Sequence, residues 1–179
     1  VLPKFGVEVT TDRTFYTPGQ RVEGVVQADY FFGKPVAEGE VRIAGSVWDV
    51  ERTVVVDLQG ETDGDGTYAF SFDLPDYFAA SGLDSGQAQF ALEVTVIDQT
   101  DHPEQVSRVL PVAAQPLVIE AVPESGVLKP GVENVVYVLV SYPDGRPAQA
   151  ALRVQSGGGQ IIETETGGFG LAEIRFVPV

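Results

Sequence analysis

Apolar and polar residues alternate with a period of two along most of this 179-residue chain. Such alternation is typical of β-strands that have one buried face and one face in water. The alternating or apolar runs before residue 113 lie at 5–9, 22–30, 41–43, 54–58, 68–74, 90–96 and 106–110. They predict about seven strands, which is the number expected of an immunoglobulin-like or fibronectin-like sandwich.

The remainder of the chain continues in the same style. Five further runs predict strands at 117–121, 135–142, 151–154, 161–164 and 171–177. One segment has helical character, Asp76 to Leu83, where Asp76 could cap a turn or two before Gly82 ends it. No other stretch has a period near 3.6, so the sequence predicts an all-β fold.

Turn residues recur in the same order along the chain, which indicates an internal repeat. Pro18-Gly19 returns as Pro130-Gly131, and Gly33-Lys34-Pro35 returns as Gly145-Arg146-Pro147, both 112 residues later (130 − 18 = 112; 145 − 33 = 112). The third pair of landmarks is Asp63-Gly64-Asp65-Gly66 and Gly167-Gly168-Phe169-Gly170. These residues suit tight turns. The sequence therefore predicts two tandem antiparallel sandwiches, residues 1–113 and 115–179.

The second copy is shorter than the first. Aligning Gly66 with Gly170 gives a shift of 104 (170 − 66 = 104), so Val179 corresponds to Pro75 (179 − 104 = 75). The first copy continues for about 37 residues beyond that point, to Val112 (112 − 75 = 37), through two strong strands. We expect the second sandwich to lack its last two strands within this sequence. Its exposed edge is then expected to favour self-association.

Composition excludes several classes of function. The net charge of −15 argues against nucleic acid or an anionic membrane surface as a partner, because both require clustered Lys and Arg. The chain has no Cys, which excludes disulfides, thiol catalysis, zinc–thiolate sites and iron–sulfur clusters. It also has no Met, even at position 1, which suggests a piece of a longer protein.

Asp63 and Asp65 form the most ligand-like motif, and they are a weak candidate for calcium. Two carboxylates separated by glycine resemble part of a calcium loop. However, the twelfth position of such a loop would fall on Leu74 in place of Glu. A tight turn between strands explains the same residues, because Asp and Gly favour turns. We therefore expect no cofactor and no metal site.

The single histidine, His102, does not predict catalysis. Asp98 or Asp101 could complete a Ser-His-Asp arrangement, but no Gly-x-Ser-x-Gly segment exists to present a nucleophile. The segment from Asp98 to Pro103 instead reads as a hairpin tip. The sequence predicts that the chain is not an enzyme and has no catalytic residue.

Four aromatic residues are candidates for an interface with a neighbouring module: Tyr30, Phe31, Phe32 and Trp48. In strand alternation Tyr30 and Phe32 face one way and Phe31 the other, so not all three can be core. Burial in the core is nevertheless the expected place of each, because aromatic residues dominate sandwich interiors.

Particular motifs resemble a known family. Val1-Leu2-Pro3-Lys4-Phe5, then Phe15-Tyr16-Thr17-Pro18-Gly19 and Tyr30-Phe31-Phe32-Gly33-Lys34-Pro35-Val36, resemble the third macroglobulin domain of the alpha-2-macroglobulin and complement component family. The segments 143–147 and 166–171 resemble the fourth domain, so the resemblance covers the whole chain in order. The absence of Cys points to a bacterial member.

The resemblance implies a structural role. Family members carry a bait segment that a protease cuts, after which the protease is trapped, and many also hold a Cys–Gln thioester. Neither part occurs in this sequence, so no inhibitory residue is carried over. The implied function is a non-catalytic scaffold in a bacterial, extracytoplasmic protease inhibitor (periplasmic, cell-surface or secreted, and membrane-anchored or secreted as a whole). Its implied partners are other domains of the same chain, with proteases as targets.

A different class of function also fits the sequence. A stalk of bacterial immunoglobulin-like repeats, in an adhesin that binds a surface partner, would share the Pro-Gly and Asp-Gly turns. Such stalks carry near-identical repeats, whereas the two copies here share little beyond their turns.

Overall fold

The computed structural model describes residues 3–48, 51–76, 78, 87–155, 157 and 159–178, and every regular element in them is a strand. The predicted all-β class is confirmed. The segment from Asp76 to Leu83, with its helical character, lies mostly outside the described residues. No helix in the described part is long and apolar enough to cross a membrane.

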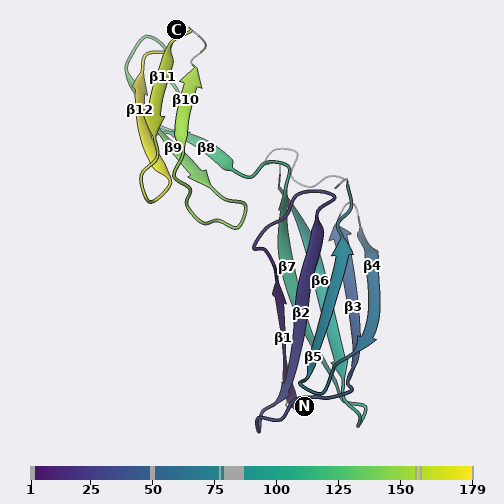
Figure 1. The fold of residues 1–179 in the computed structure, drawn as a ribbon. Coiled ribbons are helices and arrows are strands. Elements are labelled where there is room, and N and C mark those ends of the chain that lie inside the picture. Colours follow the sequence, from purple (N-terminus) through teal and green to yellow (C-terminus); the bar gives the residue numbers. More distant parts are fainter. Residues whose placement is uncertain are drawn as a thin grey trace. The chain divides into compact units, whose positions relative to one another are not determined.

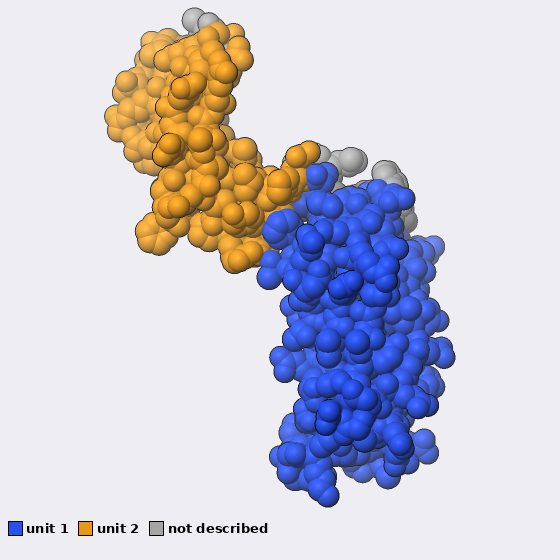
Figure 2. Space-filling view, in the orientation of Figure 1, with its two compact units in different colours: residues 1–114 blue, residues 115–179 orange. Residues whose placement is uncertain are grey.

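The chain divides into two compact units, Val1–Ala114 and Gln115–Val179, which Figure 2 shows in blue and orange.

Unit 1 is a sandwich of two antiparallel sheets, of three and four strands in the described residues (Figure 1). Its strands are β1 (Phe5–Thr11), β2 (Arg21–Tyr30), β3 (Glu40–Trp48), β4 (Arg52–Glu61), β5 (Thr67–Asp73), β6 (Gln87–Ile97) and β7 (Pro103–Ala113). One sheet has the order β1-β2-β5 and the other β4-β3-β6-β7. This division of seven strands is that of a fibronectin-like or immunoglobulin-like sandwich.

The core of unit 1 lies between the two sheets and contains the inward half of each alternating run. Val22, Val26 and Ala28 of β2 are fully buried, whereas their strand neighbours Glu23 and Val25 are exposed. The larger side chains of this core are Phe5, Tyr16, Ile43, Phe70, Phe72, Phe90, Leu92 and Leu110. The period-two pattern of the sequence therefore corresponds to burial, as the physics of a two-layer sandwich requires.

Unit 2 contains five strands in the described residues: β8 (Val118–Pro123), β9 (Asn134–Ser141), β10 (Ala151–Gln155), β11 (Ile161–Glu165) and β12 (Leu171–Phe176). They form a sheet of order β12-β9-β8 and a separate pair, β10-β11. Its small core contains Val136, Val138, Val140, Ala148, Leu152, Ala172 and Ile174.

The two units share a topology as far as unit 2 goes. The sheet β8-β9-β12 repeats β1-β2-β5, and the pair β10-β11 repeats β3-β4. In unit 1, β3 pairs with β4 on one side and with β6 on the other. Among the described residues, β10 pairs only with β11.

Candidate functional site

A buried threonine joins the turns at one end of unit 1. Thr62 is 3% exposed, and its Oγ1 donates a hydrogen bond to Val36 O at 2.6 Å and accepts one from Gly39 N at 2.8 Å. Val36 N in turn donates to Ala28 O at 2.9 Å. We call Ala28, Val36, Gly39, Thr62 and Gly66 the corner of unit 1. The corner ties the β2–β3 connection to the β4–β5 turn.

Unit 2 has the same corner, built from Val140, Ala148, Ala150, Thr166 and Gly170. Thr166 Oγ1 donates to Ala148 O at 2.8 Å and accepts from Ala150 N at 2.8 Å. Ala148 N donates to Val140 O at 2.9 Å. Each hydrogen bond has its counterpart in unit 1, although only the threonine and the final glycine are the same residue type in both corners.

A glycine with positive φ completes each corner. Gly66 has φ 74° and Gly170 has φ 71°, a region that side chains disfavour. A Cβ on Gly66 would lie 2.5 Å from Ala28 O, and one on Gly170 would lie 2.2 Å from Val140 O. The last glycine of each predicted turn motif is therefore required by both conformation and space.

The β-turns with Gly-Lys-Pro and Gly-Arg-Pro also have matched geometry. Tyr30 N donates to Lys34 O at 2.8 Å, and Tyr142 N donates to Arg146 O at 2.8 Å. Gly33 N donates to the carbonyl of Tyr30 at 2.8 Å, and the equivalent bond from Gly145 N measures 2.9 Å. The repeat predicted from turn residues is thus a repeat of hydrogen bonds.

The prediction of core burial is wrong for Phe31 and Phe32, which are 68% and 72% exposed. Strand β2 ends at Tyr30, so both phenylalanines lie in the turn, where strand alternation no longer directs a side chain inward. Tyr30 is half-buried and joins them to the core. Its ring meets that of Phe5 edge-on at 5.7 Å and stacks on that of Phe32 at 5.1 Å.

The prediction of core burial is also wrong for Trp48, which is 62% exposed. Trp48 is the last residue of β3, and the inward register of that strand belongs to Val41, Ile43 and Val47, which pack with the core. Trp48 therefore points outward. It lies at the opposite end of unit 1 from Phe31 and Phe32, because the Tyr30 hydroxyl reaches Asp98 beside the start of β3, whereas Trp48 ends that strand.

The carboxylate of Asp63 accepts hydrogen bonds within its own turn. Its Oδ1 accepts hydrogen bonds from Asp65 N at 3.0 Å and Thr67 N at 2.9 Å, and its Oδ2 accepts one from Thr67 Oγ1 at 2.6 Å. These bonds, those from Thr67 first, lower the pKa of Asp63 below its ordinary value. Among the described residues, no group of three or more His, Asp and Glu side chains is placed to hold a metal ion.

A second aspartate, Asp98, organises the β6–β7 hairpin. It is 5% exposed and accepts hydrogen bonds from Thr100 N at 2.8 Å, His102 N at 3.0 Å and the Tyr30 hydroxyl at 3.0 Å. Burial by itself raises the pKa of Asp98, but the hydrogen bonds from His102, Thr100 and Tyr30 outweigh it and hold the pKa well below the ordinary value. Burial, then the bond to Asp98, raises the pKa of Tyr30.

His102 belongs to the same hairpin, and neighbouring side chains contact its ring nitrogens. Its Nδ1 lies 2.7 Å from Thr100 Oγ1 and 3.4 Å from Asp98 Oδ1, and the ammonium group of Lys4 contacts its ring nitrogens. These neighbours form a hairpin tip, as the sequence indicated, and no serine hydroxyl is among them.

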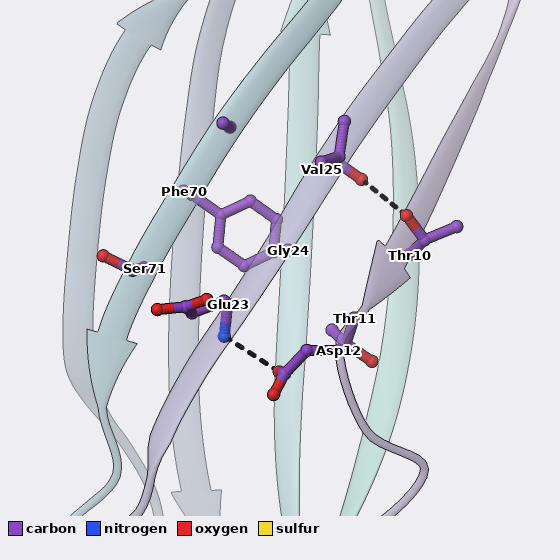
Figure 3. A pocket seen from close by; sticks show the side chains of 9 residues that line it. Thr10, Thr11, Asp12, Glu23, Gly24, Val25, Phe70 and Ser71 are labelled. Carbon is purple, nitrogen blue, oxygen red and sulfur yellow. Dashed lines mark hydrogen bonds between the residues drawn. The ribbon is translucent and has the colours of Figure 1, made fainter.

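A shallow hollow of about 570 Å³ lies on the outer face of the β1-β2-β5 sheet (Figure 3). Thr10, Glu23, Val25 and Ser71 line it, and Phe70 lies against Gly24 at its floor. Two hydrogen bonds are drawn there. The bond from Thr10 Oγ1 to Val25 O joins β1 to β2, and the bond from Glu23 N to Asp12 Oδ1 joins β2 to the residue that follows β1. These hydrogen bonds of the hollow stabilise the sheet.

Sequence reasoning missed the three polar side chains that organise the turns: Thr62, Thr166 and Asp98. A signal existed for the threonines, because each directly precedes a repeated turn, Asp63-Gly64 or Gly167-Gly168. Asp98 carried a signal too, since Asp at the start of a hairpin tip commonly accepts backbone hydrogen bonds two residues ahead.

Comparisons with known proteins agree with this architecture. Residues 1–76 match the family described as Macroglobulin domain MG3. The chain is 26% identical over 156 residues to the alpha-2-macroglobulin of Thermotoga maritima, which covers 86% of the chain but 10% of that protein. The chain thus spans about a tenth of the length of this curated relative.

Solved structures give the same fold. The trypsin-activated alpha-2-macroglobulin of Escherichia coli superposes with a TM-score of 0.56 at 10% identity, over 98% of this chain and 15% of that one. The native conformation of the same E. coli protein gives a TM-score of 0.54 at 10% identity, over 98% and 14%. Sequence and fold lead to one conclusion: residues 1–76 match the macroglobulin domain MG3 family, and the chain as a whole is similar to bacterial alpha-2-macroglobulins.

Proposed function

We propose that this chain is part of the non-catalytic framework of a bacterial alpha-2-macroglobulin-like protease inhibitor. The observation that carries the proposal is the corner repeated in both units, with matched hydrogen bonds around Thr62 and Thr166. The buried, hydrogen-bonded hydroxyls of Thr62 and Thr166 hold turns in place. Such use of polar groups suits a scaffold, whereas a catalytic site needs them directed at a substrate.

We also propose that unit 2 is a fourth-domain-like macroglobulin module that two further strands complete. The support is the register of β10 and β11. Ala151 pairs with Glu165 as Glu40 pairs with Glu61, so Leu152 and Val154 correspond to Val41 and Ile43. In unit 1 those two positions are 0% exposed, because β6 and β7 extend the sheet beside them; Leu152 is 9% exposed and Val154 is half-buried.

The missing coverage has an energetic consequence. Apolar surface left in water forgoes about 25 cal/mol per Å², and an unpaired strand edge invites other strands. The chain by itself should therefore associate through β10 or leave unit 2 less ordered than unit 1. In the full-length protein, the strands equivalent to β6 and β7 would cover this edge.

The remaining proposals follow from the family. Partners of the chain are other domains of the same polypeptide, and proteases are targets of the whole protein. The full-length protein works outside the cytoplasm, where foreign proteases are met. Neither nucleic acid nor a cofactor is involved, in keeping with the net charge of −15 and the absence of Cys.

Protease trapping tests this assignment. Trypsin, the protease named with the E. coli structure, would be mixed at equal molar amounts with the full-length protein or with residues 1–179. Cleavage of a large protein substrate should fall only with the full-length protein. The 179-residue chain should leave cleavage unchanged and should hydrolyse nothing itself. Stoichiometric trapping by residues 1–179 alone would contradict a framework role.

A further inference from the structure

Phe31 and Phe32 form an exposed apolar pair at one end of unit 1. They are 68% and 72% exposed, adjacent in sequence and held on a defined turn. Single exposed hydrophobic residues are ordinary, but a rigid aromatic pair is a feature of contact surfaces. We call Phe31 and Phe32 the aromatic pair.

The equivalent turn of unit 2 shows that the turn itself does not require these residues. Tyr142, Gly145 and Arg146 repeat the hydrogen bonds of Tyr30, Gly33 and Lys34. Between them unit 2 carries Pro143 and Asp144, and Asp144 Oδ2 forms an ion pair with Arg146 Nε at 2.7 Å. The same backbone thus forms with a polar tip in one unit and an aromatic tip in the other, so the aromatic pair is not explained by folding of the turn.

The aromatic pair is also pre-organised. Phe32 stacks on Tyr30, which contacts the buried Phe5 and donates a hydrogen bond to the buried carboxylate of Asp98. Phe31 lies close to Gly6 of β1. A Cβ placed on Gly6 would be 3.9 Å from the Phe31 ring. A pair fixed in this way loses little side-chain freedom when a partner binds, which favours contact.

The direction of β1 indicates which partner lies nearest. Phe5, at the start of β1, pairs with Tyr30, at the end of β2. A polypeptide joined to the amino-terminal side of β1 therefore emerges at the end of unit 1 where β2 ends, and the aromatic pair directly follows β2. The curated relative is about ten times the length of the matched region, which leaves room for such neighbours.

We propose that the aromatic pair is the docking surface for the domain that precedes this chain in the full-length protein. The partner surface is apolar, and the contact fixes the entry of β1 through Phe31 over Gly6 and through the Phe32–Tyr30 stack. The proposal rests on the proposed function in one respect, that other domains of one polypeptide surround the chain.

Photo-cross-linking in the full-length protein tests the proposal. A photo-reactive phenylalanine analogue replaces Phe32, and mass spectrometry locates the cross-linked peptide. A cross-link to the sequence before this chain is the expected result. A cross-link to a second molecule, to a later domain or to no protein segment would overturn the proposal. No protease enters the cross-linking assay. The docking proposal can therefore fail while the protease-trapping result supports the proposed function, and the proposed function can fail while the cross-link is found.

A matched variant gives an independent readout. F31P/F32D introduces the residues of the unit 2 turn, so the turn should be kept and the aromatic surface removed. In the 179-residue chain its unfolding midpoint should move by less than about 2 °C. In the full-length protein, amide exchange at the start of β1 should accelerate at least tenfold. Phe169→Asp, at another exposed phenylalanine on a turn, serves as the control and should change neither quantity. Unchanged exchange in full-length F31P/F32D would also overturn the proposal.

Discussion

Thr62 and Thr166 lie 104 residues apart (166 − 62 = 104) and hold equivalent places in two separate units. Each hydroxyl donates a hydrogen bond to a backbone carbonyl and accepts one from a backbone N–H. The Thr62 hydroxyl donates to Val36 O and accepts from Gly39 N. A single hydroxyl oxygen can do both at once. The repeat therefore preserves a hydrogen-bonding role where it has not preserved the surrounding apolar residues.

Thr62→Val should destabilise unit 1, because valine keeps the shape but leaves Val36 O and Gly39 N without their partner. Each buried group left unpaired costs about 1–3 kcal/mol. Thr62→Ser is the control, since it keeps the hydroxyl and loses only a methyl group, worth about 0.8 kcal/mol. Urea unfolding followed through unit 1 amides measures both variants. Equal stability of the valine and serine variants would show that the hydroxyl has no such role.

Gly66→Ala should be more damaging than Gly64→Ala, although the two glycines lie in one turn. Gly66 has φ 74° and no room for a Cβ beside Ala28 O, whereas a Cβ on Gly64 meets nothing within 4 Å. Positive φ alone costs a side chain about 1–2 kcal/mol, and the close contact adds to it. Thermal unfolding of the two variants compares them directly. A Gly66→Ala protein as stable as Gly64→Ala would contradict the corner geometry.

The sequence predicted the fold well because alternation reports burial directly in a two-layer sandwich. All twelve runs that it identified became strands in the described residues. The side chains at strand ends were less predictable. Phe31, Phe32 and Trp48 are of residue types that usually fill a core. Phe31 and Phe32 are exposed because β2 ends at Tyr30 and leaves them in the turn, whereas Trp48 is exposed as the outward-facing last residue of β3. Where a strand ends depends on turn hydrogen bonds such as that of Gly33 N with Tyr30 O, and alternation carries no record of them.

Asp98 should make the stability of unit 1 sensitive to acid. Its pKa is lower in the folded protein than the value of about 3.9 in an unfolded chain. A lowered folded pKa gives stability that is present above the unfolded pKa and is lost as pH falls below about 4. Denaturation midpoints from pH 7 to pH 3 measure this effect.

Asp98→Asn provides the comparison for that series, because it removes the charge and keeps the size. The native chain should be more stable than the variant at pH 7, and the difference should shrink steadily below about pH 4. A difference that stays constant across the whole range would mean that ionisation of Asp98 does not contribute.

Calcium should have no effect on stability. The carboxylate of Asp63 already accepts three hydrogen bonds from Asp65 and Thr67 within its own turn. A ligand that binds the folded state raises the melting temperature, so a chelator should leave the Tm of the native chain unchanged. A fall of several degrees on adding chelator would restore Asp63 and Asp65 as a calcium site.

Amide hydrogen exchange, read separately on the two units, tests most directly that both are copies of one framework module. It would be measured on residues 1–179 and on the same chain extended by the next stretch of the natural protein, about 37 residues (112 − 75 = 37). We expect exchange to slow in β9, β10 and β12 on extension, because strands equivalent to β6 and β7 then cover β10, while unit 1 stays unchanged. Equal, strong protection of both units in a monomeric 179-residue chain, with no change on extension, would contradict this account.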